Sequence, residues 1–124
     1  MRVVILPTEQ EASDFAADFI EKLIIEKENA VLGLATGSSV LLTYEALIKK
    51  YQSGEMSFKN ITTFNLDEYI GLQPDHTQSY RHYMNRKLFN HIDIDHKKTY
   101  IPECFNKDYE SSCESYESRV KENG

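Results

Sequence analysis

The stretch AVLGLATGSS, residues 30–39, decides the fold. Its first six residues, Ala30–Ala35, are apolar throughout, which is typical of a parallel strand covered on both faces, because a strand with one solvated face alternates apolar and polar residues. Thr36–Ser39 then supplies a turn, and a helical pattern of apolar residues runs from Leu41 to Tyr51. A strand, a glycine turn and a helix in this order predict a βα unit.

The same alternation extends in both directions from this unit. Upstream, Val3–Leu6 is strand-like, and Thr8 with Glu11 forms a capping box that predicts the start of a helix. Downstream, Ile61–Asn65 is rich in β-branched residues and predicts another strand. The upstream helix carries one apolar stripe, made of Ala12, Phe15, Ala16, Phe19, Ile20, Leu23 and Ile24.

Two further helices and a candidate strand follow. Ser79 is expected to cap a helix that carries Tyr80, Tyr83, Met84 and Leu88. Lys98–Pro102 is a short candidate strand. Asp108 is expected to cap a last helix whose stripe is Tyr109, Cys113, Tyr116 and Val120.

Strands that alternate with helices predict an α/β fold, here a Rossmann-like parallel sheet flanked by helices. Ligands of such sheets bind outside the carboxyl ends of the strands. Two loops leave predicted strands at that edge, Thr36–Ser39 and Asn65–Leu72. We therefore expect function to reside in these two loops.

Length and charge narrow the classes of function. The chain has 124 residues, the size of one domain, and a net charge of −6. Nucleic acids and anionic membranes attract basic surfaces, so neither is an expected partner. No apolar run approaches the roughly 20 residues that span a bilayer, and the N-terminus lacks a signal-type apolar region. We expect a cytoplasmic protein.

The cysteines and histidines do not predict a metal site. Cys104 and Cys113 lack the closely spaced partners of a zinc site, and in a cytoplasmic protein they are expected to be free thiols. The run HIDIDH, residues 91–96, would place polar side chains on one face of a strand, but a scatter of polar loop residues explains such a pattern more often. We expect no bound metal.

The turn Thr36–Ser39 is a candidate phosphate site. The first N–H groups of a helix are unpaired and favour an anion, Gly37 permits close approach of a ligand, and Thr36, Ser38 and Ser39 add hydroxyl groups. The alternative is an ordinary turn in which Ser39 caps the helix. The pattern leaves both possibilities open, and the nucleotide-binding loop G-x-x-x-x-G-K-[ST] is absent.

Asp67 and Glu68 set adjacent carboxylates at the end of the predicted strand Ile61–Asn65. A carboxylate in such a place can act as the base that removes a proton beside a carbonyl group. The alternative, more common for an arbitrary Asp-Glu pair, is that both side chains are solvated or cap a short helix.

Three motifs resemble the glucosamine-6-phosphate deaminase family: LGLATGSS (Leu32–Ser39), TTFNLDEYIGL (residues 62–72) and SYRHYMN (Ser79–Asn85). The resemblance runs along the whole chain, and its most specific part is F-N-L-D-E-Y-x-G-L. It implies that Asp67 is the catalytic base, with Glu68 and Tyr69 in supporting positions. It also implies that the phosphate of the substrate is bound by Thr36, Gly37, Ser38 and Ser39.

The activity implied by this resemblance is the conversion of glucosamine 6-phosphate and water to fructose 6-phosphate and ammonia, in N-acetylglucosamine catabolism. The substrate would be a small amino-sugar phosphate, and no metal or organic cofactor would take part. Asp67 would carry a proton between C2 and C1 of the open-chain sugar. The oligomeric state stays open, a homo-oligomer included.

The sequence departs from the family in two places. Val40 stands where the family usually has proline, which removes preorganisation but no ligand group. No stretch matches the family's segment G-x-[GN]-G-H-x-x-F-N-E-P, which carries the ring-opening histidine. We therefore expect residues 1–124 to be the N-terminal half of a single isomerase/deaminase domain, with sheet edges left open. The alternatives are a non-catalytic sugar-phosphate-binding fragment and a sugar-phosphate lactonase.

Overall fold

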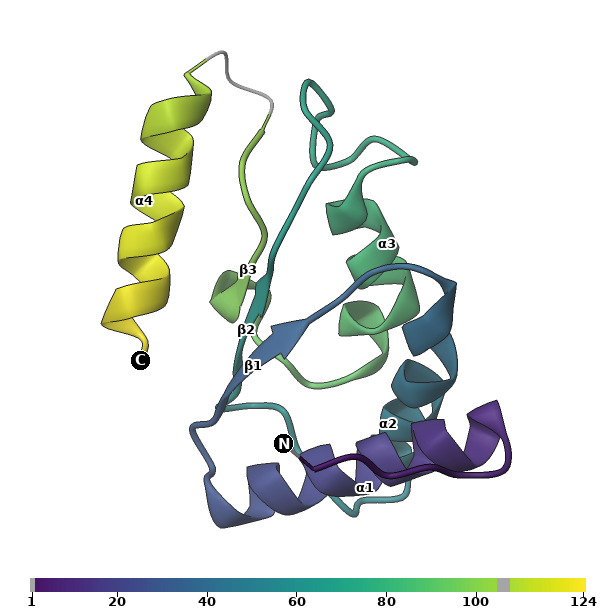
Figure 1. Ribbon diagram of the computed structural model, residues 1–124. Coiled ribbons are helices and arrows are strands. Elements are labelled where there is room, and N and C mark those ends of the chain that lie inside the picture. The colour runs from purple at the N-terminus through teal and green to yellow at the C-terminus, as the bar shows by residue number, and fades with distance from the viewer. Residues whose placement is uncertain (1, 105–107) are drawn as a thin grey trace.

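A three-stranded parallel sheet separates one helix from the other three (Figure 1). The computed structural model describes residues 2–104 and 108–124. The strands, in their order across the sheet, are β1 (Val31–Leu34), β2 (Thr62–Asn65) and β3 (Thr99–Tyr100). The helices are α1 (Glu9–Glu26), α2 (Leu41–Gln52), α3 (Tyr80–Lys87) and α4 (Tyr109–Glu122). The predicted α/β fold with a parallel sheet is confirmed.

The strands β1 and β2 end at the same level. Their register pairs Leu34 with Asn65, the last residue of each strand. The Asn65 side chain reinforces this pairing, because its Nδ2 donates a hydrogen bond of 3.0 Å to the Leu34 carbonyl. The loops that follow the two strands therefore leave the sheet side by side at its carboxyl edge.

The main core lies on the face of the sheet that α1, α2 and α3 cover. It contains the inward-pointing residues of β1 together with large side chains from the helices and loops: Leu32, Leu34, Tyr44, Leu47, Phe58, Ile61, Met84, Leu88 and Phe89. Burial of each large apolar side chain contributes about 1.5–3 kcal/mol. This core fixes the positions of α2 and α3 relative to the strand ends.

The strand β1 is covered on one face, whereas its uniformly apolar sequence predicted cover on both. Leu32 and Leu34 are buried, but Val31 and Gly33 are exposed. The helix α4 packs on the same face of the sheet, but over β2 and not over β1. There the centroids of the Tyr116 and Phe64 rings are 5.8 Å apart. The described part of the chain therefore leaves the Val31 side of β1 open.

Val3–Leu6 does not form the predicted strand. The segment is extended beside α1 (Figure 1), and Val3 and Ile5 keep 69% and 89% of their surface exposed. A strand needs a neighbour for its backbone hydrogen bonds. Among the described residues, the sheet consists of β1, β2 and β3, and none of them pairs with this segment.

The helix α1 begins as predicted, and its predicted apolar stripe is buried only in part. Thr8 Oγ1 accepts a hydrogen bond of 3.1 Å from the Glu11 N–H, so the predicted cap is confirmed. Ile24 is buried, and Ile20 and Leu23 pack against the core, as the stripe predicted. Phe15 and Phe19 are exposed, whereas the small side chain of Ala17, which lies outside the stripe, is buried. The apolar pattern is wide enough to fit two faces, and the face with the small residue allows closer packing.

The other predicted helix boundaries are confirmed. Ser79 Oγ accepts from the His82 N–H at 3.0 Å at the start of α3, and Asp108 accepts from the Ser111 N–H at 3.1 Å at the start of α4. The candidate strand at Lys98–Pro102 is β3. Cys104 and Cys113 are free thiols, as expected. In the described ranges no helix combines the length and the apolarity that crossing a membrane requires.

Candidate functional site

The turn after β1 presents its polar groups to solvent. Gly37 has a φ of 105°, a conformation that side-chain-bearing residues rarely adopt. A 3-10 turn, Ser38–Val40, follows and leads into α2, whose N-cap is Val40 without a side-chain hydrogen bond. Ser39 therefore does not cap α2, so the cap that the alternative assigned to it is wrong. Ser38 and Ser39 are both exposed, so their hydroxyl groups are accessible to a ligand.

Two tyrosines hold the backbone of this turn from neighbouring helices. The Tyr44 hydroxyl, on α2, donates to the Ala35 carbonyl, and the Tyr83 hydroxyl, on α3, donates to the Gly37 carbonyl at 2.6 Å. Burial raises the pKa of both phenols, so both stay protonated donors at neutral pH. The sequence assigned both tyrosines to apolar stripes, and nothing in the pattern indicated their hydroxyl contacts.

The two carboxylates of the loop after β2, those of Asp67 and Glu68, have different surroundings. Glu68 accepts hydrogen bonds from three backbone N–H groups, those of Tyr69 and Tyr80 at 2.8 Å and that of Arg81 at 2.9 Å. Two of these donors belong to the first turn of α3, so Glu68 is an additional cap of that helix. Asp67 is exposed and takes part in none of the hydrogen bonds recorded for the described residues.

Tyr69 lies on the outer side of the same loop. Its ring packs against that of Tyr80 with a centroid distance of 4.7 Å, and the Tyr80 hydroxyl donates to the Tyr69 oxygen at 3.3 Å. This hydrogen bond is the main cause of a raised pKa at Tyr69, and burial adds little because half of the residue is exposed. Tyr69 therefore forms, with Tyr80, an aromatic pair at the α3 end of the loop.

Two anchors of the β2 and β3 ends were not identified from the sequence. The Tyr116 hydroxyl, on α4, donates to the carbonyls of Asn65 and Tyr100. The Arg81 guanidinium, largely buried, donates to the Thr99 hydroxyl and carbonyl, both at 2.7 Å. Because both groups bind backbone or strand atoms, they fix where the strands end. A buried side-chain oxygen, Asn65 Oδ1, has no partner among the described residues.

A cavity of about 380 Å³ opens beside Asp67, between its loop, the exit of β3 and α4. Apolar side chains dominate its lining, among them Leu66, Ile70 and Pro102. Asp67 and Glu68 supply carboxylates on one wall. The turn 36–39 does not line this cavity. The structure thus brings the turn and Asp67 to one edge of the sheet, with the cavity on the α4 side of Asp67.

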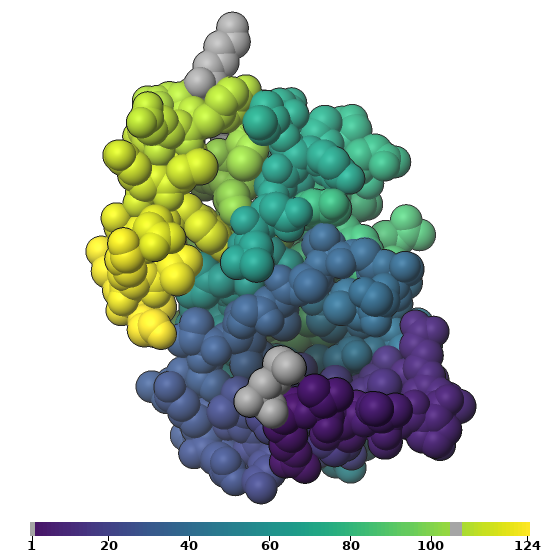
Figure 2. Space-filling view, viewed as in Figure 1, coloured from purple at the N-terminus to yellow at the C-terminus, as the bar shows by residue number. Residues whose placement is uncertain are grey.

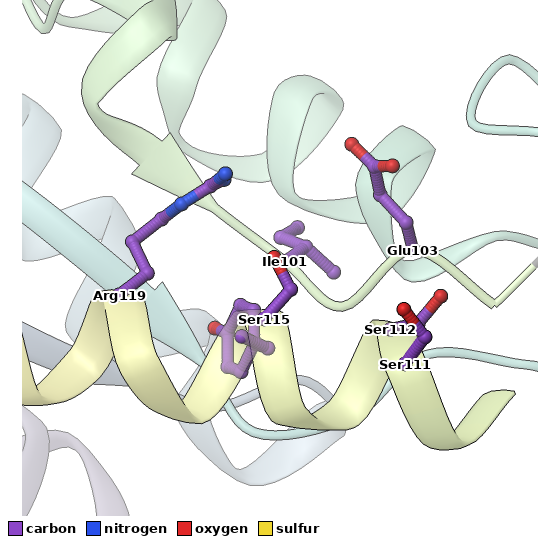
Figure 3. Close-up of a pocket in the computed structure, with 7 residues that line it drawn as sticks. Ile101, Glu103, Ser111, Ser112, Ser115 and Arg119 are labelled. Carbon is purple, nitrogen blue, oxygen red and sulfur yellow. The ribbon is translucent and has the colours of Figure 1, made fainter.

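A smaller hollow of about 210 Å³ lies on another side of α4 and has a polar lining. Figure 3 shows the Arg119 guanidinium and the Glu103 carboxylate at opposite ends of it, with Ser115 between them. Arg119 also lies over the Tyr100 ring, with 5.0 Å between its guanidinium carbon and the ring centroid. A guanidinium and a carboxylate in one hollow do not favour a ligand of either charge.

Carboxylates and thiols line the larger cavity, but in the described part of the chain they are not grouped so that they could hold a metal ion. In residues 2–104 and 108–124 no three side chains of His, Cys, Asp or Glu are placed so that they could hold one ion. The chemistry that the described groups offer is anion binding at the turn 36–39 and proton transfer at Asp67.

Comparison with known proteins gives consistent matches. The family model described as glucosamine-6-phosphate isomerases/6-phosphogluconolactonase matches residues 8–124. A glucosamine-6-phosphate deaminase from Thermoanaerobacter pseudethanolicus is 48% identical over the whole chain, which covers 49% of that protein. A deaminase from Colwellia psychrerythraea is 50% identical over 104 residues, which cover 84% of this chain and 39% of that protein.

Solved structures agree with these sequence matches. A monomeric glucosamine-6-phosphate deaminase superposes with a TM-score of 0.95 at 44% identity, over 98% of this chain and 51% of that one. A 6-phosphogluconolactonase from Thermotoga maritima gives a TM-score of 0.71 at 25% identity, over 90% of this chain and 50% of that one. The chain spans about half the length of the curated relatives it matches.

The family model covers nearly the whole chain, and a solved deaminase structure shares its fold. The chain therefore belongs to the family of glucosamine-6-phosphate isomerases and 6-phosphogluconolactonases.

Proposed function

We propose that this chain is the N-terminal half, residues 1–124, of a glucosamine-6-phosphate deaminase domain. The complete domain converts glucosamine 6-phosphate and water to fructose 6-phosphate and ammonia. Support comes from relatives of that name at 42–50% identity, against 25% for the lactonase structure from Thermotoga maritima. The observation that carries the proposal is that Glu68 is bound by backbone N–H groups whereas Asp67 is exposed. The Asp67 carboxylate is therefore available at the same sheet edge as the candidate phosphate turn.

The phosphate of the substrate binds at the turn after β1. Thr36, Ser38 and Ser39 contribute hydroxyl groups, and Gly37 lets the phosphate approach the backbone. The turn Ser38–Val40 offers the first N–H groups of a helical segment, and α2 adds the positive end of a helix dipole. Tyr83 holds the Gly37 carbonyl, so the turn keeps its shape before substrate arrives.

Asp67 moves one proton along the sugar. In the open-chain substrate the carboxylate removes the proton from C2, beside the C1 aldehyde, the aldehyde oxygen takes a proton from water, and an enolamine forms. Return of the proton to C1 gives an imine at C2. Water then adds to C2, the C–N bond breaks, and ammonia leaves a ketone, which is fructose 6-phosphate. The stoichiometry requires water but no organic cofactor.

Glu68 and Tyr69 act on Asp67 through the backbone. Glu68 is fixed by three N–H groups and is adjacent to Asp67 in the chain, so it determines where the catalytic carboxylate lies. Tyr69 and Tyr80 close the α3 side of the loop. Because sugar phosphates are charged and do not cross membranes unaided, we expect the reaction to take place in the cytoplasm.

A chimera tests the proposal directly. Residues 1–124 are joined to the part of the Thermoanaerobacter pseudethanolicus deaminase that lies beyond its match with this chain. We expect the chimera to release ammonia from glucosamine 6-phosphate. Asp67→Asn should lower the rate by about 10²–10⁴-fold while leaving substrate binding within about threefold, because the base is lost and the ligand groups remain.

Asp75→Asn is the matched control, because Asp75 is an exposed carboxylate in the same connection between β2 and α3. It should leave the rate unchanged. A folded chimera that hydrolyses 6-phosphogluconolactone and releases no ammonia would show that this chain belongs to a lactonase and not to a deaminase. A folded chimera that binds the amino-sugar phosphate without turnover would support the non-catalytic alternative, and full activity of Asp67→Asn would remove Asp67 from the mechanism.

A further inference from the structure

Two thiols from different elements meet at the cavity beside Asp67. Cys104 lies just after β3, and Cys113 lies on α4, one turn beyond its first residue. Both line the same cavity of about 380 Å³. The proposed deaminase reaction uses neither thiol. A pair of cysteines on facing elements of one cavity is a candidate for disulfide formation.

The two thiols differ in their surroundings. Cys104 is half-buried, and burial raises its pKa, to which the neighbouring Cys113 thiol and the Glu68 carboxylate add. Cys113 is exposed. Both thiols line the same cavity, and the effect of Cys113 on the pKa of Cys104 agrees with that placement. Because a thiolate is the reacting species and must meet its oxidant, Cys113 is the thiol that reacts first.

The two elements that carry the thiols are fixed to different degrees. The Cys104 carbonyl accepts a hydrogen bond of 2.7 Å from the Gly71 N–H, which ties the exit of β3 to the Asp67 loop. By contrast, no residue of α4 is buried, and cavities lie on two of its sides. In the space-filling view α4 forms a ridge along one side of the molecule (Figure 2). The helix is therefore free to adjust to the Cα separation of roughly 4.4–6.8 Å that a disulfide requires.

We propose that Cys104 and Cys113 form a reversible disulfide that fastens α4 to the exit of β3 and fixes one wall of the Asp67 cavity. The oxidant is a small disulfide such as glutathione disulfide. The Cys113 thiolate attacks one of its sulfurs and displaces a glutathione thiolate. Cys104 then loses its proton to water, attacks the Cys113 sulfur and displaces the second glutathione thiolate. One disulfide is formed, and one is reduced to two thiols.

The test uses the 124-residue chain and glutathione disulfide. Oxidation should remove both titratable thiols from each chain without forming a disulfide-linked dimer on a non-reducing denaturing gel. Trypsin cuts after Lys107, between the cysteines, so the bond should join two tryptic peptides that dithiothreitol separates. Hydrogen exchange of the α4 amides should slow by about tenfold or more in the oxidised chain, because the bond removes undocked conformations of the helix.

The matched control moves the second thiol by one position. In Cys113→Ser combined with Glu114→Cys, the new thiol is one residue farther along the chain but is displaced around the helix, and residue 114 does not line the cavity. Bond formation in this variant should be at least about tenfold slower. Equal rates in both proteins, a disulfide-linked dimer, or glutathione retained on Cys113 would each overturn the proposal.

Discussion

The helices α3 and α4 flank the same sheet, and the chain holds them in opposite ways. The first turn of α3 is bound by Glu68, its Arg81 is bound to Thr99, and its Met84 is fully buried. No residue of α4 is buried, and Tyr116 and Arg119 make its recorded contacts with the sheet. The Asp67 loop lies between them. One side of the candidate site is therefore rigid, and the other can adapt.

This difference originates in the side chains that face the sheet. Met84 of α3 and Leu88, the residue directly after this helix, enter the main core. On α4, by contrast, Ser111, Ser112 and Ser115 line a polar hollow. Serine buries little apolar surface, so α4 gains little free energy from docking. Segments of low local stability are the ones that open and close around ligands. We infer that adjustment during function takes place at α4 and not at α3.

Core substitutions should separate the two helices most strongly. Met84→Ala should lower the free energy of unfolding by about 2–5 kcal/mol, because it leaves a cavity in the packed core. Val120→Ala, the corresponding apolar truncation on α4, should change it by less than about 0.5 kcal/mol, because Val120 is 37% exposed. Urea unfolding of both variants checks this. Similar losses for both would show that α4 is part of the cooperative core.

Removal of the Glu68 carboxylate should have the next largest effect. Glu68→Ala leaves three backbone N–H groups without their acceptor, and we expect a loss of about 2 kcal/mol. Glu114→Ala, an exposed carboxylate on α4, is the control and should be neutral. Hydrogen exchange should become faster at the amides that begin α3. A neutral Glu68→Ala variant would mean that the loop is held by other contacts.

Loss of the Tyr116 hydroxyl should loosen α4 alone. Tyr116→Phe removes the hydrogen bonds to Asn65 and Tyr100 and keeps the ring contact with Phe64, so about 1 kcal/mol should be lost. The α4 amides should exchange faster, and those of α3 should not change. Equal acceleration in both helices would contradict the independent docking of α4.

The last prediction concerns pH. Burial raises the pKa of Tyr116 to about 12, above the value of about 10 for an unfolded tyrosine. Because the folded value is the higher one, this contribution to stability is complete below about pH 10 and is lost as pH rises toward 12. The difference in stability between the wild type and Tyr116→Phe should therefore shrink over that window. A constant difference from pH 8 to 12 would show that the hydroxyl is not buried against the strand ends.

The sequence predicted the fold and the candidate site where local patterns decide them. Caps at Thr8, Ser79 and Asp108 and the strand at Ile61–Asn65 are set by neighbouring residues, and the structure confirms them. The predictions that failed were the strand at Val3–Leu6 and the burial of Phe15 and Phe19 on α1, because both depend on what packs against these residues. An apolar residue has the same local signal whether a neighbour covers it or not.

The hydroxyl contacts of Tyr83 and Tyr116 were missed for a related reason. Each joins a helix to a strand end or turn distant in sequence, Gly37 in one case and Asn65 in the other. Nothing in the local pattern distinguishes such a tyrosine from one that only fills space. The division between Asp67 and Glu68 was left open for the same reason, because it depends on where α3 begins.

The central claim is that one ligand contacts both loops, its phosphate at the turn 36–39 and its reacting carbon at Asp67. Backbone amide shifts of the ¹⁵N-labelled chain, titrated with glucosamine 6-phosphate, inorganic phosphate and glucosamine, test it most directly. Inorganic phosphate should move Gly37, Ser38 and Ser39, the amino-sugar phosphate should move these together with Asp67 and Glu68, and glucosamine should move neither set at the same concentration. Shifts confined to one loop with the amino-sugar phosphate, or located on α1 and α2 away from both loops, would contradict the account.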